Sequence, residues 1–300
     1  MIKATGFNSS MHVDEQDLLE TNKNCVFCGS KDLKKLFNVQ KKPAIMLVKC
    51  KRCKAVSVDR FPKDGLLKDY YESYYSVNKT GVTFSDIERF SAVIFDGVRN
   101  LSKKRMKILD FGGGSGSIAI NIARSMLKEK KANSVEITIV DYNSFSIEDI
   151  GNIEVNWVDT LEKVNEKRFD LVIASAIVEH IPRGDSVRKL LRLVDKGGIV
   201  YFRTPFVVPI IRLFKLFKIN IDFTFPGHLH DLGKDFWENI LDIYQIENFK
   251  ILSSSASPVE SNFKTSFIRT FAAHLFKIPS RFFNFYDLVG GWQIFFKKID

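Results

Sequence analysis

The stretch KILDFGGGSG, at Lys107–Gly116, is the sequence feature that most restricts how this chain folds. A short apolar run leads to Asp110, a glycine-rich turn follows, and apolar residues then recur at helical spacing from Ile118. Because glycine has no Cβ, it adopts positive φ easily and lets a ligand lie against bare backbone. The helix that follows presents free N–H groups at its start. The pattern predicts a strand, a ligand-binding turn and a helix.

This glycine turn fits two binding patterns. Gly114-x-Gly116-x-x-Ala119 satisfies the loose dinucleotide fingerprint, in which a pyrophosphate caps the helix. Asp110-x-Gly112-x-Gly114-x-Gly116 instead places an acid at the strand end and glycines at alternate positions. It resembles motif I of the class I S-adenosylmethionine (SAM) methyltransferases. A pyrophosphate disfavours a neighbouring carboxylate, whereas SAM carries an ammonium and a sulfonium, so the acid favours SAM.

Length and composition indicate a soluble globular protein with one larger core and a small module. The chain has 300 residues, of which 45% are hydrophobic and 27% charged. No apolar run reaches the ~18 residues of a membrane span, and the N-terminus lacks a signal-peptide core, so we expect a cytoplasmic protein. Eleven Lys/Arg and three acids lie between Glu20 and Arg60. Such a basic module binds nucleic acid or acidic lipid, or is simply a solvated surface.

All four cysteines form two matched pairs near the N-terminus, Cys25-x-x-Cys28 and Cys50-x-x-Cys53. This spacing predicts a four-cysteine zinc ribbon over residues 23–60, preceded by a flexible tail over 1–22. Disulfides and a redox role are the alternatives. Four protein ligands leave no open coordination position, so the zinc is expected to be structural. Since about 40 residues cannot build a sufficient core, the metal would supply folding energy.

A helical connector is expected over residues 61–104. Tyr70 and Tyr74, like Tyr71 and Tyr75, are spaced to share one face of a helix. We expect this face to pack on the ribbon or the core, and the alternative is an aromatic flank to the cofactor or substrate.

Strands and helices alternate through the rest of the chain, which predicts right-handed crossovers and a parallel sheet. Strands are expected at 107–111, 135–140, 153–158, 169–174, 199–203, 249–255 and 292–298, with helices at 85–101, 115–130, 185–194 and 234–244.

Acids close two of these strands. Asp141 follows the strand after the glycine turn, where a carboxylate accepts the ribose hydroxyls of a nucleoside. Asp159 follows the next strand and either accepts the adenine amino group or caps a helix. The segments VDY, VDT, FDLVIAS with EHIP, and DKGGIVYFRTP follow in the order and spacing of class I SAM-dependent methyltransferases, across about residues 105–255.

With its N-terminal cysteines, the chain resembles a bacterial subgroup of these enzymes that carries a zinc ribbon. The resemblance implies a Rossmann-like α/β fold whose seven-stranded, mostly parallel sheet ends in an antiparallel strand, within a methyltransferase domain over 105–300. It implies SAM as methyl donor and, as acceptor, a sugar, nucleotide-sugar or glycan in surface-polysaccharide or natural-product biosynthesis. The expected donor-binding residues are Asp110, Gly112, Gly114, Gly116, Asp141, Tyr142, Asp159 and Ser175.

Three histidines follow the predicted donor site. His180, in EHIP, is expected to order a loop, and no second metal is expected there. In the subgroup, a histidine of an H-x-H pattern lies beside the substrate, which implies His228 first and His230 second as catalytic bases. A turn anchor is the alternative. The sequence departs from the subgroup after His230, at Asp231–Gly233.

Two insertions, 204–233 and 257–290, are expected to shape the acceptor side. Residues 204–220 read as a basic amphipathic helix that covers the active site, contacts a membrane surface or meets a partner. The second insertion is aromatic and basic, and is expected to form helices that complete the acceptor pocket or contact a second copy. Segments 207–219 and 263–286 would make any peripheral contact with the inner face of a membrane.

The sequence thus predicts a SAM-dependent methyltransferase with a small-molecule or glycan acceptor. An RNA or protein methyltransferase that docks through the ribbon is one alternative, although no Asn-Pro-Pro-Tyr-type tetrad follows the strand at 169–174 and nucleic acid is disfavoured. An NAD-dependent oxidoreductase and a noncatalytic zinc-ribbon binding protein are the others. The sequence predicts no oligomeric state.

Overall fold

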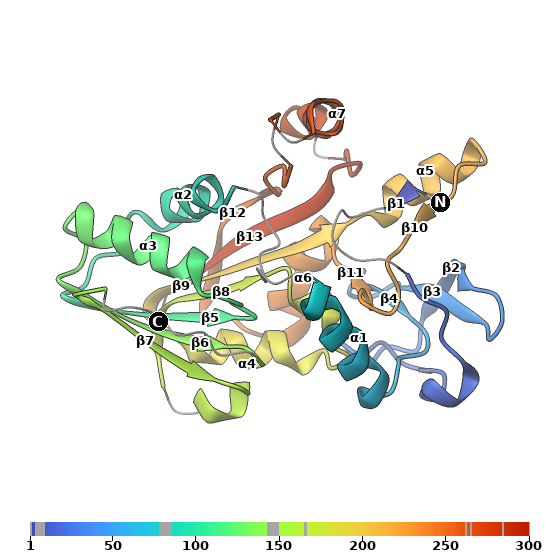
Figure 1. Cartoon of the computed structure of the whole chain (residues 1–300), viewed down its shortest axis with the longest axis horizontal. Helices are drawn as coiled ribbons and strands as arrows, with labels where there is room; N and C mark the ends of the chain where they lie inside the picture. The colour runs from blue at the N-terminus through green and yellow to red at the C-terminus, as the bar shows by residue number, and fades with distance from the viewer. Residues whose placement is uncertain are drawn as a thin grey trace.

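The computed structural model describes residues 2–3, 10–77, 86–142, 150–164, 167–261, 263–264, 266–283 and 285–299. A seven-stranded sheet forms its centre, in the order β12-β13-β9-β8-β5-β6-β7 (Figure 1). Its strands are β5 Arg105–Phe111, β6 Ser134–Val140, β7 Ile153–Val158, β8 Phe169–Ser175, β9 Val194–Phe206, β12 Phe249–Ala256 and β13 Gly290–Lys298. Only β13 runs antiparallel to its neighbours in this sheet. The prediction of a seven-stranded, mostly parallel α/β fold is confirmed.

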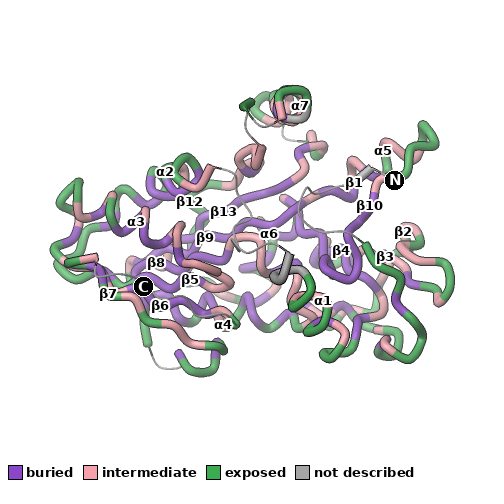
Figure 2. Tube along the Cα trace, in the orientation of Figure 1, coloured by how far each residue is buried: buried purple, intermediate pink, exposed green. Residues whose placement is uncertain are grey.

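Helices cover both faces of the sheet, and successive strand residues supply the two cores. Ile108 packs with α2 (Ile87–Val98) and α3 (Ser117–Lys128), whereas Leu109 packs with α4 (Asp185–Leu193) and α6 (Lys234–Tyr244). The side chains of a strand alternate between the faces of its sheet, so a strand covered on both sides is apolar throughout. The purple strands of Figure 2 lie between these helices.

The cysteine module forms a four-stranded antiparallel sheet in the order β11-β4-β3-β2. Three strands come from the N-terminal region: β2 Leu33–Gln40, β3 Ile45–Cys50 and β4 Val56–Val58. The fourth, β11, is His230–Asp231, from the predicted substrate region. The Phe27 and Phe236 rings also meet, with centroids 4.9 Å apart. The module is therefore fastened to the large sheet by pairing and packing.

Residues 10–22 differ from the expectation of a flexible tail. Val13 and Leu18 are only 1% and 5% exposed, and a short 3-10 helix, Glu15–Asp17, lies between them. The Val13 N–H donates to Gln40 Oε1 at 2.9 Å. The sequence did not reveal the burial of Val13 and Leu18, because these two apolar residues form no periodic pattern. Contacts with the sheet of the cysteine module bury them.

The expected helix over 204–220 is shorter than predicted. Strand β9 continues to Phe206, and α5 occupies Val208–Leu216. The buried Asp231 carboxylate accepts the N–H groups of Val207 and Val208, at 2.6 and 3.1 Å. A carboxylate satisfies free donors at a helix start, so this contact sets where α5 begins.

The remaining elements are short or peripheral: β1 Ile2–Lys3, α1 Asp64–Val77, η2 Leu161–Val164, η3 Val178–His180, β10 Ile221–Asp222, α7 Phe267–Lys277 and η4 Ile278–Arg281. The second insertion thus contains a helix, as expected. Among the described residues, no helix combines the length and the apolar character needed to cross a membrane.

Candidate functional site

The glycine turn after β5 leaves a backbone surface with no room for side chains. Gly112, Gly114 and Gly116 have φ of +71°, +53° and +72°. A Cβ on Gly112 would lie 2.6 Å from Ile177 Cγ1, and one on Gly116 would lie 2.3 Å from Ile139 Cδ1. Only glycine satisfies both the positive φ and the close packing. The main chain of this turn therefore packs directly against Ile139 and Ile177.

Asp110 ends β5 as a buried acid. Its side chain is 3% exposed, and its Oδ2 has no hydrogen-bond partner among the described residues. Burial, together with a smaller contribution from nearby Asp141, raises the Asp110 pKa to about 7. Buried polar atoms normally have partners, so an unpartnered carboxyl oxygen beside a bare backbone turn fits a ligand that brings a cation or a hydrogen-bond donor.

The second predicted acid lies against the same turn. Asp141 Oδ2 accepts the Gly114 N–H at 2.8 Å. The structure thus brings together Asp110, the glycines and Asp141, as the sequence predicted. Ser175, at the end of neighbouring β8, has a buried hydroxyl with no described partner. These residues fit the polar amino-acid and ribose parts of a nucleoside sulfonium.

Two other predicted donor residues lie farther out. The Asp141 N–H donates to Val158 O at 3.0 Å, so the ends of β6 and β7 are adjacent. Tyr142 is 87% exposed. Asp159 is also exposed, and its carboxylate pairs with Lys163 Nζ at 2.8 Å, which lowers the Asp159 pKa. The adenine role of Asp159 stays a prediction.

A second polar cluster adjoins the turn through Ile177, which precedes η3. It consists of Glu179, His180 and His228, whose potential ligand atoms all lie within 4.8 Å of one another. Glu179 and His228 are 1% and 4% exposed, and Glu179 Oε2 and His228 Nδ1 have no partners among the described residues. Two imidazoles and a carboxyl group can bond hydroxyl groups or hold a metal ion.

Burial keeps this cluster uncharged. It raises the Glu179 pKa to about 8 and lowers the His180 pKa to about 4. It also lowers the His228 pKa well below its ordinary value, with a smaller contribution from His180. Near neutral pH, His228 therefore has an unprotonated nitrogen that can accept a proton.

His180 orders the loop beside it. Its Nδ1 lies 2.6 Å from the Gly227 carbonyl oxygen and 3.0 Å from Tyr71 Oη. If Nδ1 carries the proton, it donates to that carbonyl and leaves Nε2 toward Glu179 Oε1, at 3.7 Å. Tyr71 also donates to Gly227 O, at 3.2 Å. The connector therefore places Tyr71 against this cluster. The alternative reading of its tyrosines, an aromatic flank to the cofactor or substrate, stays a prediction.

His230, the second predicted base, does not lie free in the site. Its Nδ1 contacts Ser57 Oγ at 2.8 Å, and its Nε2 contacts Ile181 O at 2.9 Å. The ring is fully buried against Phe27 and Phe61. Both nitrogens are engaged, so His230 joins the ribbon to the large domain. His228 precedes β11 and its N–H donates to Thr224 O at 2.9 Å, whereas His230 lies in β11, so the two side chains take different directions although they are two residues apart.

Sequence reasoning missed the side chain of Glu179 as a site residue. Its position after β8, in EHIP, was the available signal, because ligands bind at the carboxyl ends of parallel strands. What the sequence hid was the approach of His228, which the contact from the Leu229 N–H to Glu179 O, at 2.8 Å, holds in place.

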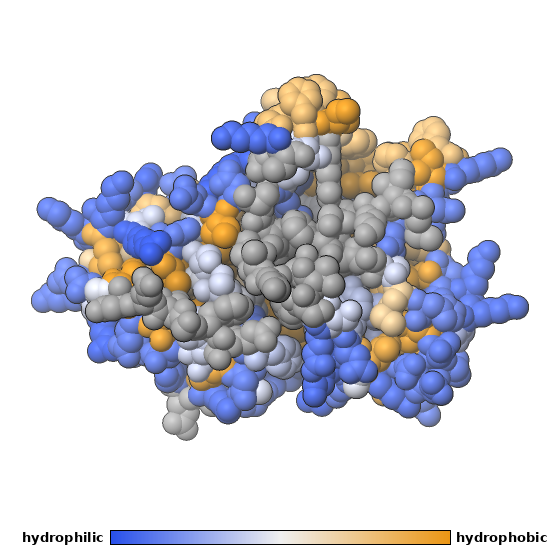
Figure 3. Space-filling model, in the orientation of Figure 1, coloured by the Kyte–Doolittle hydropathy of each residue, from blue (hydrophilic) through white to orange (hydrophobic). Residues whose placement is uncertain are grey.

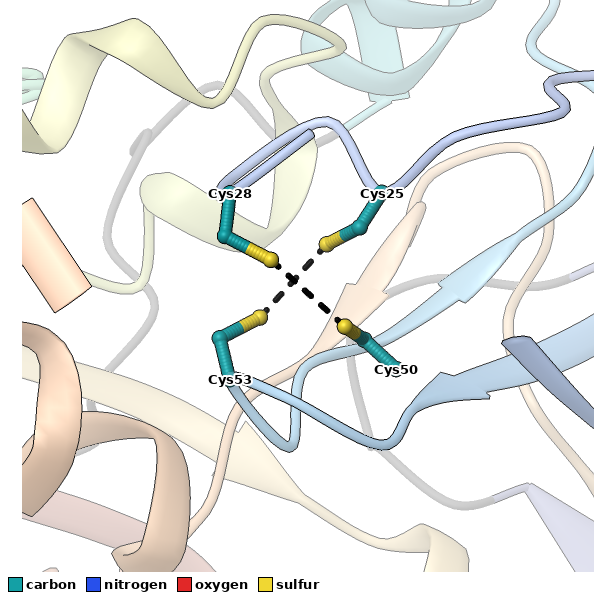
Figure 4. A group of neighbouring side chains, drawn as sticks. All are labelled: Cys25, Cys28, Cys50 and Cys53. Atoms are coloured by element: carbon teal, nitrogen blue, oxygen red, sulfur yellow. Dashed lines mark hydrogen bonds between the residues drawn. The ribbon is translucent and has the colours of Figure 1, made fainter. Parts of the chain in front are cut away.

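The four cysteine sulfurs converge between the two knuckles (Figure 4). Cys25 Sγ lies 3.5 Å from Cys53 Sγ, and Cys28 Sγ lies 3.6 Å from Cys50 Sγ. A tetrahedral zinc with Zn–S bonds of ~2.3 Å places its sulfurs about 3.8 Å apart. The arrangement therefore fits a structural zinc ion.

Comparison with known proteins finds the same fold type. A family model described as "Methyltransferase domain" matches residues 86–246, just over half of the chain. Among solved structures, a SAM-dependent methyltransferase described as putative, from Streptococcus mutans, is 10% identical with a TM-score of 0.43. That match covers 72% of this chain and 50% of the other, so the chain spans half of that protein.

Two further solved structures have similar scores. N-methyltransferase NodS from Bradyrhizobium japonicum WM9, in complex with S-adenosyl-L-homocysteine, is 11% identical, with 71% of this chain and 87% of NodS covered and a TM-score of 0.40. The plantazolicin methyltransferase BpumL is 13% identical, with 78% and 94% covered and a TM-score of 0.46. No curated protein matches the sequence.

The glycine turn yields a matched test. Gly116→Ala adds a Cβ 2.3 Å from Ile139 at φ +72°, whereas Gly197→Ala adds one at φ +75° with nothing within 4 Å. We expect both to lose about 1–2 kcal/mol of unfolding free energy from backbone strain. Only Gly116→Ala should also weaken nucleoside binding, which calorimetry measures. Equal binding by the two variants would contradict a nucleoside site at the glycine turn after β5.

Proposed function

Since this chain belongs to the methyltransferase-domain family and is a SAM-dependent methyltransferase, we propose that it methylates a sugar, nucleotide-sugar or glycan-type acceptor. One observation carries the acceptor class: Glu179 Oε2 and His228 Nδ1 are buried, unpartnered among described residues, and beside the donor turn. Leaving such atoms unsatisfied costs about 1–3 kcal/mol each. The hydroxyl groups of a sugar satisfy donors and acceptors alike.

Each donor-side residue has a role that follows from its position. The glycine turn offers main-chain N–H groups, and Asp110 faces the ammonium of the amino-acid portion. Asp141 accepts the ribose hydroxyls in exchange for its contact with Gly114. We assign the adenine end to Tyr142 and Asp159. When bound, SAM supplies an electrophilic methyl group on its sulfonium.

The acceptor-side residues position a hydroxyl and move its proton. Methyl transfer needs the acceptor atom in line with the donor, and a base that takes its proton. His228 Nδ1 is that base in our proposal, with Glu179 and His180 as hydrogen-bond partners of the acceptor. The stretch Ala174-Ser175-Ala176-Ile177, at the end of β8, does not match an Asn-Pro-Pro-Tyr-type tetrad, which supports an acceptor other than a nucleic-acid base.

We further propose that the four cysteines bind one structural zinc ion. Their closed donor set supports a folding role, because it offers no open position for chemistry. The ribbon also carries Ser57, which contacts His230 two residues beyond His228. Through this contact, the zinc would help to hold the segment that carries His228 in place.

Zinc removal tests this assignment. We expect about one zinc per chain by elemental analysis, and its loss in Cys28→Ser with a fall in melting temperature of about 10 °C or more. Arg52→Ser, between Cys50 and Cys53, is the control and should keep the metal. Zinc content that is unchanged in Cys28→Ser would contradict the site.

The raised pKa of Asp110 predicts how donor binding depends on pH. The folded carboxyl is protonated below about pH 7, so it pairs with the SAM ammonium only as pH rises through that value. We expect SAM affinity to increase across this range, and Asp110→Asn to weaken it about tenfold and remove the dependence. Glu179→Gln should keep the dependence, since Glu179 lies on the acceptor side. Calorimetry over a pH series measures both, and an unchanged slope in Asp110→Asn would refute the role.

The acceptor is tested by mass spectrometry of nucleotide sugars and glycan fragments incubated with SAM. We expect a methyl mass gain, with turnover reduced about 100-fold or more in His228→Ala because a proton acceptor is lost. SAM affinity should not change. His228→Ala with full turnover would remove the base. Loss of a second metal ion in that variant would make His228 a ligand instead, and no methylated glycan would overturn the acceptor class.

A further inference from the structure

Two segments expose large apolar side chains together with positive charge. The first is the end of α5 and the residues after it, where Leu216 and Phe217 are 79% and 69% exposed. The second is the stretch of residues 263–286, which contains α7 and η4 and is called here the α7–η4 insertion. Its exposed apolar residues are Phe263, Phe267, Ile268, Phe271, Leu275, Ile278, Phe282, Phe283 and Phe285. Patches of this extent mark an interaction surface. Figure 3 shows both segments as orange atoms along one edge of the molecule.

Helix α7 is attached to the body through polar residues. Thr270 is fully buried and its hydroxyl donates to Ser261 Oγ at 2.8 Å. Lys277 Nζ donates to Ser257 O and Pro258 O, at 2.5 and 3.2 Å. Residues seven apart share a helix face, so one polar side anchors the helix. The apolar side chains of α7, among them Phe267 and Phe271, are exposed instead. A helix that packs on a protein core would bury its apolar side and expose its polar side.

Both segments contain basic residues and no acidic residues. Residues 207–219 contain Arg212, Lys215 and Lys218, and residues 263–286 contain four Lys/Arg, with no Asp or Glu in either range. A second copy of the same surface would be repelled by these charges. Anionic lipid headgroups would attract them, while the aromatic side chains enter the acyl boundary.

The topology places the two segments at one edge of the sheet. Helix α5 follows β9 and the insertion follows β12. Both strands are antiparallel to β13 and therefore run in the same direction. The insertion and α5 thus extend from the carboxyl ends of the strands, as Figure 1 shows. The donor turn and the Glu179 cluster lie at this edge too.

We propose that the α5 end and the α7–η4 insertion together form a docking surface for an anionic membrane. The contact is peripheral: exposed aromatic residues enter the headgroup boundary, and Arg212, Lys218 and Arg281 pair with lipid phosphates. Three observations support this assignment: the positive charge of both segments, the exposed apolar side of α7, and the position of both segments at one edge of the sheet.

Vesicle binding by the full zinc-loaded chain tests the surface. We expect sedimentation with vesicles of phosphatidylcholine containing about one third phosphatidylglycerol, and little with phosphatidylcholine alone, since each basic residue gains from surface potential. Phe267→Ser/Phe271→Ser and Leu216→Ser/Phe217→Ser should each weaken binding about tenfold or more, because apolar area stays in water. Leu19→Ser removes an apolar side chain that is 46% exposed on another segment, and should bind normally.

SAM binding by each variant, measured by calorimetry, verifies that it is folded. No sedimentation of the parent chain with the anionic vesicles would overturn the proposal. So would binding that is unaffected by both serine pairs. A parent chain that is dimeric by light scattering, and monomeric after Phe267→Ser/Phe271→Ser, would assign the surface to a second copy instead.

Discussion

The parallel pairing of β5 with both β6 and β8 is the constraint on which the rest of the structure depends. It brings three strand ends to one edge, where each can present a polar residue. Asp110, Asp141 and Ser175 reach that edge from three separate segments. The turn between β5 and α3 must then be nearly bare, because Ile139 on β6 and Ile177, between β8 and η3, pack against it. The sheet thus shapes the ligand surface before any ligand is present.

The same edge concentrates buried polar groups that have no hydrogen-bond partner within the part of the chain that the structure describes. Asp110 and Glu179 have pKa values raised to about 7 and about 8, because both carboxyls are removed from water. Burying such groups is unfavourable, and proteins tolerate this where a ligand or reaction uses the groups. Folding is correspondingly less favourable as pH rises toward these values, since the folded state retains protons that the unfolded chain releases.

The ribbon and the large sheet form one connected structure through β11. His230 pairs with Ser57 on β4, while His228, two residues earlier, faces Glu179 and His180. Because β11 begins only at His230, His230 takes a structural position in the strand while His228, before it, takes a site position. Asp231 extends the arrangement by accepting the N–H groups at the start of α5, so the ribbon, His228 and the first turn of α5 are linked through one segment.

The sequence by itself determined what depends on neighbouring residues. The strand pattern, the glycine turn and the cysteine pairs predicted the parallel sheet, the donor turn and the clustered sulfurs, because turn geometry and side-chain periodicity are local properties. The antiparallel strand of the seven-stranded sheet was implied by the resemblance to class I methyltransferases. Only the tertiary structure decided which histidine faces the site, that Glu179 joins it, that Val13 is buried, and that α7 turns its apolar side outward. Those outcomes depend on contacts between segments far apart in the chain, whose packing no local pattern encodes.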